Sequence, residues 1–95
     1  MISIPSAFSP SYAQARVKFL EAAATASTAI RSFKHPLPGR DGEQLAMDVA
    51  LDGDPASERL LIVSSACHGV EGYCGSGVQV FALHDDEWRA KARDR

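Results

Sequence analysis

The fold is decided by residues 59–77, which read RLLIVSSACHGVEGYCGSG. Residues 59–66 form a continuous apolar run of strand length with β-branched side chains, which is typical of a strand covered on both faces of a sheet. A glycine-rich loop follows, and after it comes a segment of helical character. This order of strand, loop and helix predicts an α/β fold in which a ligand binds at the carboxyl end of the strand.

The sequence before this run predicts one helix and a β-hairpin. Ser9 is a good N-cap and Pro10 fits the first helical position, so we expect a helix over about 10–29. Asp41-Gly42 is a strong turn signal between a short strand at 31–35 and a second extended run. That run alternates large apolar residues (Leu45, Met47, Val49, Leu51) with small or acidic ones (Ala46, Asp48, Ala50, Asp52). It predicts a half-buried strand, antiparallel to its neighbour, whose aspartates form a solvated face.

Residues 78–95 predict a helix after the loop. Its buried face is expected to combine Val78, Phe81, Ala82 and Trp88. The fold class expected from these segments is α/β, with a mixed sheet and helices on both faces. The chain would supply the first helix, two or three strands and the helix that follows the loop.

His68 and Glu71 are the residues most suited to chemistry. They follow the expected strand three positions apart, with Gly69 and Gly72 beside them, so both side chains can turn toward one point. Hydrolytic zinc sites commonly use His and Glu ligands and leave one position for water, whose pKa the metal lowers to about 7. The bare spacing is common by chance and often marks a solvated pair. The strand end and the glycines favour a zinc site.

Other residues near this motif have simpler interpretations. We expect Cys67 and Cys74 to be free thiols that pack as small buried side chains, since neither has the features of a nucleophile. The glycines at 72, 75 and 77 lack the spacing of a phosphate-binding loop and are expected to let the chain turn. His84 is expected on a helix surface, and His35 before Pro36 is expected to be structural.

Nearly the whole chain resembles a known family. The stretches are SPSYAQARVKFLEAA (9–23), HPLPGRDGEQLAMDVALDGDP (35–55) and LLIVSSACHGVEGYCGSGVQV (60–80). The last is similar to the first metal-binding motif of the zinc carboxypeptidase superfamily, which includes carboxypeptidase A-like peptidases and the succinylglutamate desuccinylase and aspartoacylase amidohydrolases. The whole resembles a bacterial carboxypeptidase-like family classed as a domain of unknown function. The resemblance implies that His68 and Glu71 are zinc ligands.

The same resemblance implies that residues 1–95 contain only part of the active site. In the superfamily the third zinc ligand, a catalytic Glu and substrate-binding Arg residues come from later segments. We therefore expect an N-terminal part of a zinc-dependent hydrolase, inactive alone, whose intact relatives cleave a peptide or amide bond. Two alternatives stay open: an amidohydrolase that removes acyl groups from N-acyl amino acids, and a truncated chain with no catalytic role.

Composition limits the partners. The net charge is −2 with scattered Lys and Arg, so nucleic acid is not expected as a partner. The chain shows no apolar run of membrane-spanning length and no signal-peptide pattern, so we expect a cytoplasmic protein without membrane contact. If residues 60–63 are ordered but uncovered, their apolar side chains should be exposed or lie at a contact. We expect the isolated chain to be poorly folded or to self-associate through its sheet.

Overall fold

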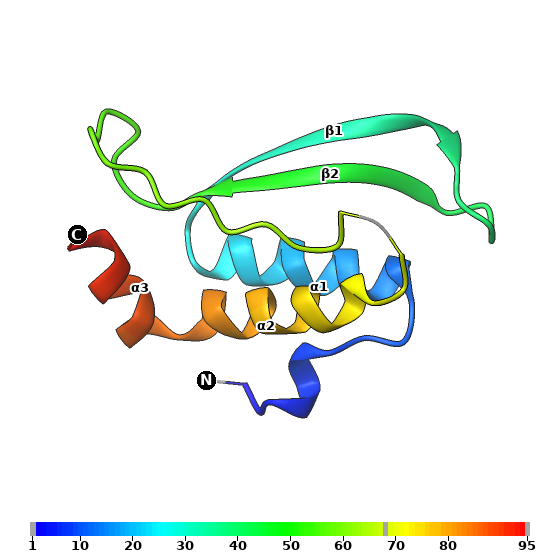
Figure 1. Ribbon diagram of the computed structural model, residues 1–95, viewed down its shortest axis with the longest axis horizontal. Coiled ribbons are helices and arrows are strands. Elements are labelled where there is room, and N and C mark those ends of the chain that lie inside the picture. Colours follow the sequence, from blue (N-terminus) through cyan, green and yellow to red (C-terminus); the bar gives the residue numbers. More distant parts are fainter. Residues whose placement is uncertain (1, 68, 95) are drawn as a thin grey trace.

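The computed structural model describes residues 2–67 and 69–94 of the chain. They form a small α/β domain in which a long hairpin lies on one side and the helices on the other (Figure 1). The elements in chain order are the 3-10 helix η1 (Pro5–Ala7), helix α1 (Tyr12–Thr25), strands β1 (Ala29–Pro38) and β2 (Gln44–Leu51), and helices α2 (Gly72–His84) and α3 (Asp86–Arg93). The α/β class is confirmed. Helices on both faces and a mixed sheet are not found among the described residues, because the sheet is two-stranded and antiparallel.

Helix α1 begins two residues later than its sequence suggests. Ser11, not Ser9, is the N-cap, because its hydroxyl accepts a hydrogen bond from the N–H of Gln14 at 3.2 Å. At the other end, Ser27 takes a left-handed conformation with φ of 59°. The N–H of Ser27 then donates to Ala24 and that of Thr28 to Ala23, which satisfies two terminal carbonyls and ends the helix before residue 29.

The hairpin confirms the predicted turn and pairing. β1 and β2 run antiparallel, with Phe33 opposite Met47 and Arg31 opposite Val49. In the turn, Gly39 donates to the carbonyl of Glu43 at 2.8 Å, and Gly42 has a φ of 80°. That angle is in the left-handed region, where a residue without a Cβ is favoured.

The two faces of β2 are reversed from the sequence expectation. Asp48 is turned toward α1 and has a side chain only 8% exposed. Met47 and Val49 lie on the opposite face and are 63% and 43% exposed, beside Phe33 at 50%. The prediction of a solvated aspartate face is therefore wrong. Arg16 of α1 supplies a partner for the Asp48 carboxylate, and Tyr12 exchanges two hydrogen bonds with the backbone of Ala46.

Residues 59–66 do not form the strand that their composition predicts. They have no regular secondary structure, although they follow the long direction of the domain from the hairpin to α2 (Figure 1). A strand needs a neighbour to pair with, and neither of the two described strands is paired with this segment. The expected exposure of its apolar side chains is confirmed, since Leu60, Leu61 and Ile62 are 72%, 66% and 76% exposed.

The region after the loop contains two helices where one was expected. α2 ends at His84, because Asp85 leaves the helical conformation with a ψ of 92°. Its carboxylate accepts a hydrogen bond from the N–H of Trp88 at 3.1 Å and thereby caps α3. The expected buried face is wrong in part: Val78 and Trp88 are exposed, whereas Phe81 packs against the core and Val80 is the buried side chain of α2.

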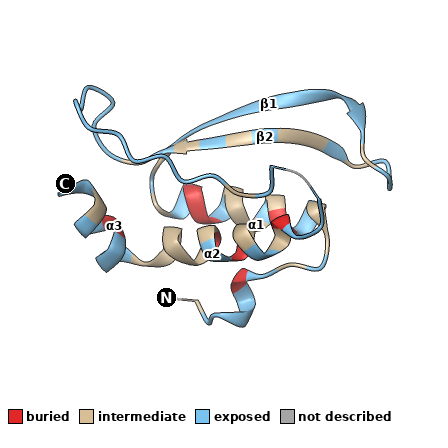
Figure 2. Cartoon of the chain, viewed as in Figure 1, coloured by how far each residue is buried: buried red, intermediate tan, exposed pale blue. Residues whose placement is uncertain are grey.

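The core is small and lies between the helices. Ala7, Ala22 and Val80 are buried at its centre, and half-buried apolar side chains of Ile2, Phe19, Phe81 and Leu83 surround them (Figure 2). α1 packs against α2 on one side and the hairpin on the other. Among residues 2–67 and 69–94, no helix combines the length and apolar character that crossing a bilayer requires.

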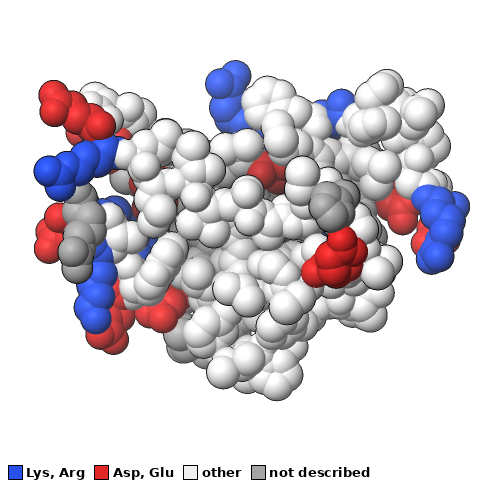
Figure 3. Space-filling model, in the orientation of Figure 1, with Lys and Arg blue, Asp and Glu red and all other residues white. Residues whose placement is uncertain are grey.

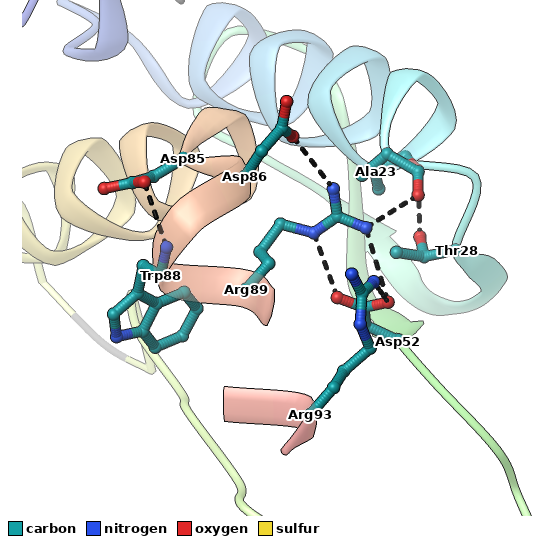
Figure 4. A network of polar contacts seen from close by, with 9 residues as sticks. Ala23, Thr28, Asp52, Asp85, Asp86, Trp88, Arg89 and Arg93 are labelled. Atoms are coloured by element: carbon teal, nitrogen blue, oxygen red, sulfur yellow. Dashed lines mark hydrogen bonds and ion pairs between the residues drawn. The ribbon is translucent and has the colours of Figure 1, made fainter. Parts of the chain in front are cut away.

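Arg89 of α3 ties three segments together (Figure 4). It is 8% exposed, and its guanidinium donates to both carboxylate oxygens of Asp52 at 2.9 and 3.3 Å, just after β2. It also donates to the carbonyl of Ala26, at the end of α1, at 2.9 Å. Asp86 and Arg93 complete the network. Asp52, expected on the solvated face of the second strand, is therefore a half-buried anchor for α3.

Candidate functional site

The candidate metal motif lies where the irregular segment turns into α2. Ala66 and Gly69 both have left-handed backbone angles, with φ of 57° and 66°. Hydrogen bonds then run from Gly72 to the carbonyl of Gly69 at 3.2 Å and from Cys74 to that of Glu71 at 3.2 Å. The loop thus reverses direction within a few residues and passes directly into the helix.

Glu71 stands at the N-terminal end of α2 and is exposed. Its carboxylate folds back over the backbone of Gly69, so that a Cβ at position 69 would come within 2.1 Å of Oε2. Gly69 is therefore favoured by its φ, and a side chain at this position would also displace the Glu71 carboxylate. The helix end also carries partial positive charge, which favours an anion there. Glu71 is placed to offer oxygen atoms to the loop that precedes it.

The other predicted ligand, His68, lies outside the described residues. Within the part of the chain that is described, no group of three or more His, Cys, Asp or Glu side chains is arranged to hold a metal ion. The donor chemistry of His68 and Glu71 suits zinc. These two residues would fill half of a tetrahedral site.

The glycines at 72, 75 and 77 lie inside α2 and do not extend the turn. They allow close approach of other segments to the helix. A Cβ at Gly72 would lie 2.6 Å from the Cα of Ala66, and one at Gly77 would lie 2.2 Å from the ring of Phe8. The prediction that these glycines let the chain turn is wrong. Their role is in packing, and Gly72 lets residue 66 lie against the first turn of α2.

Gln79 fixes the segment that leads into the loop. Its Nε2 donates to the carbonyl of Val63 at 2.8 Å, and its Oε1 accepts from the hydroxyl of Ser65 at 2.5 Å. The sequence contains no signal for this contact, because nothing in the spacing shows that residues 63 and 65 lie beside α2. Gln79 positions the candidate site and does not belong to it.

The remaining candidates are two cysteines beside the motif and two histidines away from it. Cys67 and Cys74 are free thiols, as expected, but both are exposed, so the prediction that they pack as buried residues is wrong. His84 ends α2 and lines an open pocket with Lys18 and Glu21. His35 is exposed in β1, where its Nδ1 accepts from the N–H of Leu37 at 3.0 Å, a structural role as expected.

A family model described as "Protein of unknown function (DUF2817)" matches residues 8–95. No curated protein and no solved structure matches the chain.

Proposed function

This chain belongs to the DUF2817 family, and we propose that His68 and Glu71 supply two ligands of a zinc site in a hydrolase that cleaves a peptide or amide bond. Zinc, when bound, would activate water and polarise the substrate carbonyl. The proposal extends the resemblance of residues 60–80 to the first metal motif of zinc carboxypeptidases. The bond cleaved would lie in a peptide or in an N-acyl amino acid.

The observation that carries this proposal is the fold of the loop around Glu71. A carboxylate turned back over Gly69 lies beside the backbone that leaves position 68. A left-handed Gly69 and the start of α2 hold it there. This arrangement fits a side chain used for a ligand at the loop.

In this proposal the task of His68 and Glu71 is to bind the zinc ion and orient it. The third ligand, the general base and the groups that bind the substrate would come from sequence outside residues 1–95. We therefore assign no proton transfer to this chain. In this proposal residues 1–95 carry the first metal motif and are inactive alone.

Zinc titration of the chain tests the proposal. Calorimetry should show weak binding near one equivalent, because two protein ligands leave most of the coordination sphere to water. The signal should disappear in Glu71→Gln and in His68→Ala. Glu87→Gln is the matched control, since Glu87 is an exposed helical carboxylate paired only with Lys91. Circular dichroism should show that all variants keep the wild-type fold. Tight zinc binding that survives the loss of both side chains would refute the site.

A further inference from the structure

One face of α2 is in contact with the segment that leads into the candidate metal motif. Gly72, Gly75 and Gln79 are spaced three and four residues apart, so they share one face of the helix, and we call these three residues the α2 stripe. The segment meets them in reverse order: Ala66 lies against Gly72, Ser65 against Gly75, and both Ser65 and Val63 contact Gln79. It therefore runs antiparallel to α2, with its later residues nearest the start of the helix.

The glycines of the α2 stripe set how closely the segment approaches the helix. A Cβ at position 72 would lie 2.6 Å from the Cα of Ala66, and one at position 75 would lie 3.1 Å from the Cβ of Ser65. The first of these contacts is with backbone, so a side chain at position 72 would force residue 66 away from α2.

Gln79 fixes the position of the segment along the helix. Its amide nitrogen donates to the carbonyl of Val63 at 2.8 Å, and its amide oxygen accepts from the hydroxyl of Ser65 at 2.5 Å. The nitrogen can only donate and the oxygen can only accept, so the two contacts define one orientation of the amide. A single half-buried side chain thus holds two residues just before Ala66.

The conformation of Ala66 shows that these contacts constrain the chain. Its φ of 57° is in the left-handed region, which is unfavourable for a residue with a Cβ. Such a conformation persists only where the surrounding structure imposes it, and it is common at functional sites. Gly72 and Gln79 supply the constraint, and the chain turns from Ala66 into the candidate motif.

Charged side chains take no part in this contact. Residues 60–67 and 72–82 contain no Lys, Arg, Asp or Glu. In the face shown in Figure 3, the charged side chains lie mostly around the periphery, and uncharged atoms cover most of the middle. Salt weakens contacts between exposed charges, so it should have little effect on how the segment is held.

We propose that Gln79 is a positioning residue of the candidate zinc site, and that it raises the affinity for zinc by fixing where the chain enters the motif. This inference rests on the proposed function of His68 and Glu71. A loop that is ordered before the metal arrives loses less conformational entropy on binding. Gln79 itself contacts neither metal nor substrate and acts through Val63 and Ser65.

Amide hydrogen exchange without zinc tests the hold on the loop. The N–H groups of residues 72–74 donate to the carbonyls of residues 69–71, so their exchange reports the order of the loop. Gln79→Met keeps the length of the side chain and removes both hydrogen bonds. These amides should then exchange about five- to tenfold faster, whereas those of α1 should not change. Gln14→Met, at an exposed glutamine of α1, is the matched control and should exchange like the wild type.

Zinc titration of the same variants tests the link to the metal. Gln79→Met should raise the zinc dissociation constant about tenfold, and Gly72→Ala should do the same because it forces Ala66 away from α2. Gln14→Met should bind zinc like the wild type. A purely structural role would instead lower the melting temperature and speed exchange throughout α1, with zinc affinity below the melt unchanged, and that result would overturn the inference.

The other outcomes separate this inference from the zinc site itself. If the wild type binds zinc and Gln79→Met binds it equally well, the site stands and the role of Gln79 is wrong. Loop amides that exchange at the wild-type rate in Gln79→Met would also overturn that role. If the wild type binds no zinc, the site is refuted together with any effect of Gln79 on it, and the exchange rates still decide whether Gln79 holds the loop.

Discussion

Arg16 and Asp48 form a bidentate ion pair that links α1 to β2. Nε lies 2.9 Å from Oδ2 and Nη2 lies 3.2 Å from Oδ1, and the hydroxyl of Ser32 also donates to Oδ1. The pair determines which face of the hairpin meets the helix, because the Asp48 side chain is almost fully covered. Two parallel N–H···O bonds between ionised groups are among the stronger polar contacts in proteins.

Replacing Asp48 with Asn should destabilise the fold. The change leaves Arg16 without its counter-charge, and we expect the free energy of unfolding to fall by about 2 to 3 kcal/mol at pH 7. Denaturant unfolding followed by circular dichroism measures this difference. Asp41→Asn is the control, because Asp41 pairs with Arg40 in a wholly exposed setting and should show no comparable loss.

The same ion pair predicts a loss of stability in acid. Burial raises the pKa of Asp48, but hydrogen bonds from Arg16 and Ser32 and the charge of Arg16 outweigh it, so that the pKa lies below its usual value. The pKa of Asp52 is lowered in the same way against its burial, by Arg89 and Arg93. A carboxyl whose pKa is lower in the folded state stabilises that state above the unfolded pKa of about 3.9.

This stabilisation should disappear as the pH falls below about 4, through the folded pKa values. Unfolding free energies measured from pH 7 down to pH 2 should decrease over that acid range, and the decrease should be smaller in Asp48→Asn. A stability that stays constant down to about pH 2 would show that neither carboxylate is held in its charged form.

Replacing Arg89 with Lys should weaken the attachment of α3. Lys keeps the charge, but its single nitrogen cannot reproduce the two-pronged contact with Asp52 together with the bond to the carbonyl of Ala26. Because Arg89 is buried, we expect a loss of about 2 to 4 kcal/mol. Arg93→Lys is the control, since Arg93 is about half exposed and also contacts Asp52. Equal melting temperatures for the two variants would contradict the central role of Arg89.

Gly77→Ala should destabilise the protein although Ala favours helices by about 1 kcal/mol over Gly. The new Cβ would lie 2.2 Å from the Phe8 ring, including 2.7 Å from Cγ, so the whole ring must move. We expect a net loss of about 1 to 3 kcal/mol. In a Phe8→Ala background the same change should become neutral or stabilising. A thermal melt of all four variants in this cycle measures the coupling.

The chain alone should not hydrolyse peptide or amide bonds, even with zinc. An activated water still needs a proton acceptor within about 3 Å and a donor for the developing oxyanion, and residues 1–95 offer no strong candidate for either. Assays with C-terminal peptide substrates and with N-acyl amino acids should give the background rate of the His68→Ala variant. Zinc-dependent turnover that is lost in His68→Ala would show that the chain contains a complete catalytic site.

Local signals in the sequence predicted the hairpin, and they failed where distant partners decide the structure. The Asp41-Gly42 turn and the alternation at 45–51 concern neighbouring residues, so β1 and β2 were predictable. The direction of Asp48 depends on Arg16, which is 32 positions away. The run at 60–63 has the composition of a central strand, but a strand also needs neighbours, which composition cannot supply.

The place of the candidate motif in the chain could be read from the sequence, but the contacts that hold its loop could not. The motif at 68–71 and the helix after it follow from glycine and helix signals close in sequence. The contact of Gly77 with Phe8 joins distant residues, and the contact of Gly72 with Ala66 depends on the path of the loop between them, which no local signal gives. Spacing alone could not distinguish glycines that turn a chain from glycines that admit a neighbour.

The contacts of Arg89 also imply an order of folding. The hairpin turn closes across four positions, from Gly39 to Glu43, whereas Arg89 reaches Asp52 and Ala26 across 37 and 63 positions. Closing long loops costs more chain entropy, so those contacts form after the local ones. α3 therefore docks last, onto a surface that α1 and the hairpin have already built. By the same reasoning it is the first helix to open, and its amide hydrogens should exchange with solvent before those of α1.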